Sequence, residues 1–152
     1  MTQGDEMTTT KPHWIKNGYP DYQDLVESGG FQIMLWEESG HYQGDFFTVV
    51  KDKNGRYGYC VIGFGSCTGC DALDAAMPLD YDQADADWSD IVILRASIIE
   101  DFKFFTSKED LASFIEDSLR VNNGNNWYWL HDESREILSR FILILRGEYP
   151  ND

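Results

Sequence analysis

The sequence predicts an α+β fold, with a small antiparallel sheet in the N-terminal half packed against about three helices in the C-terminal half. Two observations carry this prediction. Runs rich in β-branched and aromatic residues lie before residue 64, and an Asn-Gly pair separates two of them. Apolar residues at helical spacing dominate from residue 87 onward. Strands first and helices afterwards favour a sheet with one face covered by helices.

The elements of the N-terminal half are short. Residues 21–27 (DYQDLVE) are expected to form a brief helical turn between segments rich in Gly and Pro. Residues 31–36 form a predicted strand bounded by Gly-Gly and Glu-Glu. The strongest prediction is a hairpin with strands at residues 46–51 and 57–63. Its turn contains Asn54-Gly55, a pair that tolerates the positive φ values of tight turns.

Three helical patterns follow in the C-terminal half. The first has Asp87 as its candidate cap, and residues 103–105 after it are a candidate short strand. The second begins at Ser107, whose hydroxyl can accept a hydrogen bond from an otherwise unpaired backbone N–H. The third has Asp132 as its cap, and its predicted buried stripe consists of Ile137, Leu138, Phe141, Ile144 and Leu145.

Composition and charge limit the classes of function. A chain of 152 residues suits one domain, assigned to residues 11–152, and the polar residues 1–10 are expected to be a disordered tail. The formal net charge of −15 repels nucleic-acid phosphates and anionic lipids, so direct binding to either is not expected. The sequence has no apolar run long enough to span a bilayer and no signal-peptide order at its start, which predicts a cytoplasmic location.

An acidic stretch is the candidate partner-binding site. Seven aspartates lie between residues 71 and 90, and no Lys or Arg occurs from residue 57 to residue 94. The Asp80-x-Asp82 spacing begins like a calcium loop, but Ala84 stands where a third oxygen ligand belongs. One interpretation is a solvated loop that caps the next helix; the other is a patch that docks on a basic partner. The predicted partner-binding residues are Asp80, Asp82, Asp85 and Asp87.

Three cysteines define a second candidate site. Cys67-x-x-Cys70 has the spacing of a redox disulfide or of half a zinc site. The negative charge of Asp71 works against a thiolate at this position, which disfavours the redox interpretation. The best zinc ligand set is Cys60, Cys67, Cys70 and His41. The alternative is that small thiols simply pack in a tight glycine-rich turn.

Phosphate binding and catalysis have weaker support. The glycines of this turn follow G-x-G-x-x-x-G spacing, which is not a dinucleotide fingerprint. No serine or cysteine nucleophile has a base at a defining spacing, so an enzyme is not predicted.

The turn also carries a family resemblance. Residues 63–73 (GFGSCTGCDAL), with Gly44-Asp45 and Arg56-Tyr57-Gly58-Tyr59 before them, resemble an uncharacterised family of small phage and bacterial accessory proteins. Members share a G-S-C-S/T-G-C-D-A-L turn after a β-hairpin. The resemblance covers about a third of the chain and brings no catalytic residues with it. It implies a phage or mobile-element setting, in which small acidic proteins often bind and block a host factor.

These observations lead to one predicted function and two alternatives. The prediction is a non-enzymatic, cytoplasmic accessory protein that binds and blocks a basic host protein, either a nucleic-acid-handling or an anti-phage defence factor. Self-association into a homo-oligomer is left open. The alternatives are a structural zinc domain using the cysteines, and a small-ligand or nucleotide sponge using the glycine turn and aromatic residues.

Overall fold

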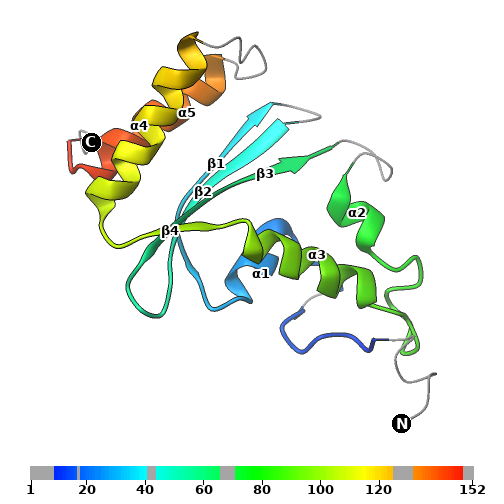
Figure 1. Ribbon diagram of the computed structural model, residues 1–152. Helices are drawn as coiled ribbons and strands as arrows, with labels where there is room; N and C mark the ends of the chain where they lie inside the picture. The colour runs from blue at the N-terminus through cyan, green and yellow to red at the C-terminus, as the bar shows by residue number, and fades with distance from the viewer. Residues whose placement is uncertain (1–8, 17, 41–43, 66–70, 125–131, 149–152) are drawn as a thin grey trace.

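A four-stranded antiparallel sheet forms the centre of the computed structural model, and helices pack against it (Figure 1). The structure describes residues 9–16, 18–40, 44–65, 71–124 (without the side chains of 121–124) and 132–148. The strands lie in the order β1-β2-β3-β4, and each is antiparallel to its neighbours. The predicted α+β class is therefore confirmed.

The described elements follow the predicted order. The strands are β1 (Gln32–Gly40), β2 (Gly44–Lys51), β3 (Tyr57–Phe64) and β4 (Lys103–Phe105). The helices are α1 (Tyr22–Glu27), α2 (Ala72–Ala76), α3 (Ser89–Glu100), α4 (Lys108–Gly124) and α5 (Asp132–Leu145). Strand β1 extends to Gly40 rather than ending at residue 36, because its second half pairs with the start of β2.

The predicted hairpin joins β2 and β3, and Asp52 organises its turn. The Asp52 carboxylate accepts hydrogen bonds from the backbone N–H groups of Asn54 at 2.9 Å and Arg56 at 2.8 Å. Gly55 has a φ of +83°, a conformation that glycine adopts without steric cost. Because one carboxylate accepts both hydrogen bonds, Asp52 and Gly55 together determine the conformation of the turn.

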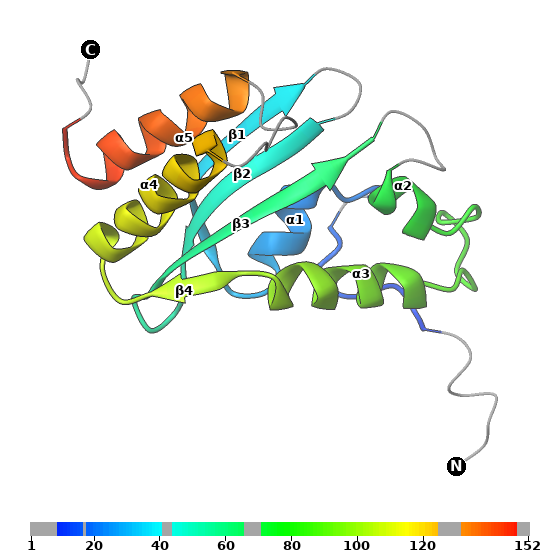
Figure 2. The ribbon, with the colours of Figure 1, turned by 45° about the horizontal axis from the view of Figure 1, so that its top comes forward.

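Both faces of the sheet are covered by helices, which corrects the expectation of a single covered face. Helices α1, α2 and α3 pack on the face that presents Val50 and Ile62, whereas α4 and α5 pack on the face that presents Phe47 and Val49. Figure 2 shows the strands running between these two groups. The cause lies in β2, where residues 46–50 (FFTVV) place apolar side chains on both alternating faces.

Only one of the three predicted helix caps is confirmed, because α3 begins after Trp88 without a side-chain cap and Asp87 is not its cap. The Ser107 hydroxyl accepts a hydrogen bond from Asp110 N–H at 3.0 Å, as predicted. Asp132 is the first residue of α5 rather than its cap. Within the predicted stripe of α5, Ile144 is exposed, and Ile142 is buried in its place. Ile142 lies one turn after Leu138, whereas Ile144 lies two turns after the buried Ile137 but near the C-terminal end of α5, where it is exposed.

Candidate functional site

The predicted partner-binding aspartates lie on the loop between α2 and α3. Asp80, Asp82 and Asp85 are all exposed on this loop. Within the described residues, none of these three forms a salt bridge. Among the residues that the structure describes, no cation compensates their negative charge, which faces solvent. We call Leu79, Asp80, Tyr81, Asp82 and Asp85 the acidic loop.

Asp87 differs from the other three because its carboxylate is used by the fold. It accepts hydrogen bonds from the backbone N–H groups of Thr9 at 2.9 Å and Ser89 at 3.1 Å. These donors lower the pKa of Asp87. Trp88 N–H in turn donates to the Thr9 carbonyl at 2.8 Å. Asp87 thus holds the N-terminal segment against the start of α3, and Thr9 is not part of a free tail.

Apolar side chains accompany the acidic loop, and sequence reasoning missed them. Leu79 is 99% exposed, a rare state for a large aliphatic side chain. Tyr81 is also exposed, and its ring meets the exposed Tyr19 ring edge-on with 5.6 Å between centroids. Tyr19 donates a hydrogen bond to Asp74. The available signal was that Leu79 directly precedes Asp80-Tyr81-Asp82, but the prediction considered only the charges.

Asp71 fixes the base of this region. Its buried carboxylate accepts hydrogen bonds from the Tyr22 hydroxyl at 2.8 Å, Gly65 N–H at 3.0 Å and Asp74 N–H at 3.0 Å. The last of these bonds caps α2. Sequence reasoning treated Asp71 only as a charge that opposes a thiolate. The structure instead shows a packing and capping residue that ties α2 to α1 and β3.

The cysteine site is only partly within the described residues. Cys60 is buried in the core between the sheet and α1–α3, and its thiol is free. Burial raises the pKa of this thiol to about 12, so it stays protonated near neutral pH. Cys67, Cys70 and His41 lie outside the described residues. Within the described part of the chain, no three potential metal ligands come together, and the zinc alternative stays a prediction.

A cleft of about 530 Å³ lies between the N-terminal segment and α1. Its lining comprises His13, Trp14, Lys16, Asp24, Glu27 and Ser28. Arg95 of α3 supports it by donating to the Ser28 hydroxyl at 2.5 Å and to the Ser28 carbonyl at 2.8 Å. The Arg95 guanidinium also lies 5.2 Å from the centre of the Trp14 ring. The cleft thus combines an indole with groups of both charge signs.

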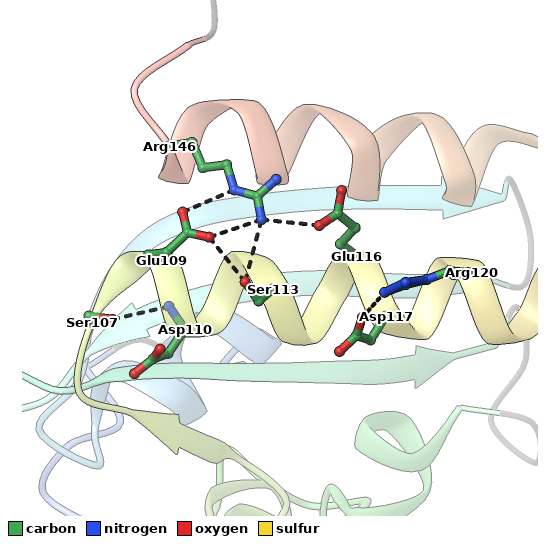
Figure 3. Close-up of polar contacts among 8 residues, drawn as sticks. All are labelled: Ser107, Glu109, Asp110, Ser113, Glu116, Asp117, Arg120 and Arg146. Atoms are coloured by element: carbon green, nitrogen blue, oxygen red, sulfur yellow. Dashed lines mark hydrogen bonds and ion pairs between the residues drawn. The ribbon is translucent and has the colours of Figure 1, made fainter.

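A second acidic region, on α4, is compensated by arginine. Figure 3 shows Arg146, just after α5, reaching to Glu109 and Glu116 of α4, with nitrogen–oxygen distances of 3.0 and 3.1 Å. These bonds lower the pKa of Glu109. Arg120 pairs with Asp117 on the same helix. The carboxylates of α4 are therefore partly neutralised by arginines of the same molecule, in contrast to those of the acidic loop.

No protein-family model, curated protein or solved structure matches this chain. In the described part of the chain, no helix is both long enough and apolar enough to cross a membrane.

Proposed function

We propose that this chain is a non-enzymatic, cytoplasmic, phage-type accessory protein that binds a basic host protein through the acidic loop and blocks it. The proposal rests on one observation, namely that charged and apolar side chains are exposed side by side on the acidic loop. Asp80, Asp82 and Asp85 are exposed and unpaired within the described residues, and a fully exposed Leu79 lies beside them.

The two surface types have separate physical roles in binding. Carboxylates facing Lys and Arg steer encounter and select the partner, but exposed ion pairs add little affinity each. Affinity at interfaces comes mainly from a few desolvated apolar or aromatic anchors. Leu79 and Tyr81 supply candidate anchors, and the aspartates around them form the polar rim.

The favoured target is a nucleic-acid-handling or anti-phage defence protein. Such proteins carry clustered Lys and Arg that bind phosphates. A loop with three exposed carboxylates can occupy that surface, and the net charge of −15 strengthens the attraction at long range. Occupying the phosphate-binding surface would block the host factor without any catalysis.

The test is capture of the partner from host lysate, followed by affinity measurements with purified components. Replacing Asp80, Asp82 and Asp85 by Asn should weaken binding about tenfold, since three surface pairs contribute roughly 0.5 kcal/mol each. Affinity should also fall as salt rises. The matched control replaces Glu38, Glu136 and Glu148 by Gln, which removes the same charge elsewhere. Equal loss in both variants, or a flat salt response, contradicts the proposal.

The cleft supports a second candidate function, the binding of a small ligand or nucleotide. An indole can stack on a base, Lys16 can meet a phosphate, and Glu27 can accept from ribose hydroxyls. A ligand panel read by thermal stabilisation tests this. Lys16→Ala should abolish any stabilisation by nucleotides, whereas Lys11→Ala, an exposed lysine outside the cleft lining, should not.

A further inference from the structure

Helix α3 presents an exposed isoleucine on the side that faces away from the core. Ile91 and Ile98 are buried against the sheet layer. Ile93, however, is 64% exposed. Exposed apolar side chains mark an interaction surface when they combine with complementary features around them, so the neighbours of Ile93 decide its role.

The exposed residues of α3 form an ordered pattern. At 3.6 residues per turn, positions three, six, seven and ten residues after Asp90 share its face. The outer face of α3 is therefore defined by the exposed residues Asp90, Ile93, Ala96, Ser97 and Glu100. Its centre is apolar or small, and a carboxylate stands at each end.

The outer face carries no positive charge. Arg95 is the only basic residue of α3, and it lies on the opposite side of the helix. There its guanidinium is bonded to Ser28 and rests on Trp14. Both terminal carboxylates of the outer face are thus left without a basic neighbour from their own helix.

We propose that the outer face of α3 binds an amphipathic helix of the partner, one that presents an apolar stripe with Lys or Arg at both ends. Ile93 acts as the apolar anchor, while Ala96 and Ser97 leave room for the partner's larger side chains. Asp90 and Glu100 select the basic ends. This inference rests on the proposed function, because it names the element by which the basic partner docks.

The charge pattern argues against a second copy of this chain as the occupant. Antiparallel pairing of two α3 helices would place Asp90 of one copy near Glu100 of the other. Parallel pairing would place each carboxylate near its own equivalent. Repulsion between like charges opposes either arrangement, whereas a partner helix with basic ends would form favourable ion pairs with both carboxylates.

The outer face of α3 continues from the acidic loop. Figure 2 shows the loop after α2 joining the N-terminal end of α3, which then runs to β4. Asp87 fastens this junction through its bonds to Thr9 and Ser89. A partner helix on α3 would therefore have further basic surface within reach of Asp82 and Asp85.

The experiment uses two synthetic helical peptides of equal length and equal lysine number. One carries a leucine stripe with lysines at both ends, and the other has glutamine in place of leucine. We expect the wild-type chain to bind the leucine peptide at least about tenfold more tightly, as measured by fluorescence anisotropy. Ile93→Ser should remove most of that preference. Leu143→Ser, a change at an exposed leucine of α5, should leave it intact.

The outcomes separate this inference from the proposed function. If Asp80, Asp82 and Asp85→Asn weakens both peptides while the leucine preference persists, both proposals stand. If the preference survives Ile93→Ser, the outer-face inference fails even when the loop variant loses binding. If only Ile93→Ser matters, the loop proposal fails and the inference stands. Sedimentation velocity showing a dimer that Ile93→Ser dissociates would assign the face to self-association and overturn the inference.

Discussion

Tyr22 donates a hydrogen bond to Asp71 across 49 positions of sequence, with 2.8 Å between the phenol oxygen and the carboxylate. Both residues are buried, and the same phenol oxygen accepts from Leu73 N–H at 3.1 Å. Burial is the main cause that raises the pKa of Tyr22, and the neighbouring Asp71 adds to it. The pair couples α1 to the start of α2, the helix that leads into the acidic loop.

Tyr22→Phe should destabilise the fold by about 1–2 kcal/mol, because it removes one buried hydrogen bond and leaves Leu73 N–H without its acceptor. Urea unfolding followed by circular dichroism measures this free energy. Tyr19→Phe is the matched control, since Tyr19 also bonds an aspartate but is exposed. Equal effects of the two changes would contradict a special role for the Tyr22–Asp71 pair.

The Cys60 thiol should be inert in the folded protein. Burial raises its pKa to about 12, so almost no thiolate exists at pH 8. In a Cys67→Ser/Cys70→Ser variant, iodoacetamide should label Cys60 only after unfolding, as read by mass spectrometry. Because the folded pKa lies above that of the unfolded thiol, Cys60 favours folding at neutral pH. That contribution declines as pH rises from about 9 towards 12. Rapid labelling of the native chain would contradict the burial.

Arg146→Met should loosen the α4–α5 pair by removing the charged bonds to Glu109 and Glu116. The pKa of Glu109 is lowered in the folded state, so its contribution is present above the ordinary value of 4.5 and is lost as pH falls through the folded pKa. Wild type and variant should therefore differ in Tm at pH 7, and the difference should shrink as pH falls below 4.5. Arg120→Met is the control, because its partner Asp117 lies on the same helix.

Zinc content distinguishes the cysteine alternative from the proposed function. If the cysteines only pack, elemental analysis of untagged protein should find far less than one zinc per chain. A value near one, with loss of folding on chelation, would instead support a site built from Cys60, Cys67, Cys70 and His41. Cys60→Ala separates the two cases further, since it should lower metal content only if Cys60 is a ligand.

Local signals predicted most of the elements. The Asn-Gly turn placed the β2–β3 hairpin, and Ser107 placed the start of α4, because each acts on backbone groups a few residues away. The incorrect detail in α5 was Ile144, which lies on the same side of the helix as the buried Ile137 but near its C-terminal end, so the helical period alone did not separate it from the core.

Tertiary relationships were not predictable in the same way. The FFTVV run of β2 places apolar side chains on both faces of the sheet. The sequence did not show, however, that α4 and α5 would cover the second face. Asp71 could not be recognised as a buried acceptor, because its donors come from Tyr22 and Gly65 in distant elements. The exposure of Leu79 and Ile93 likewise could not be predicted from the sequence, because it depends on how the surrounding elements pack.

Leu79→Ser should show how much of the affinity of the proposed complex comes from apolar burial and how much comes from charge. The free chain should keep its stability within about 0.5 kcal/mol, because a fully exposed side chain makes few contacts to lose. Affinity for the captured basic partner should fall about tenfold or more if Leu79 is buried on binding, since a buried leucine contributes roughly 1.5–3 kcal/mol. Most of this loss should lie in the dissociation rate and should persist at high salt, because apolar burial is not screened. Leu143→Ser tests whether the effect is local. A loss that disappears at high salt would mean that the acidic loop acts through charge alone.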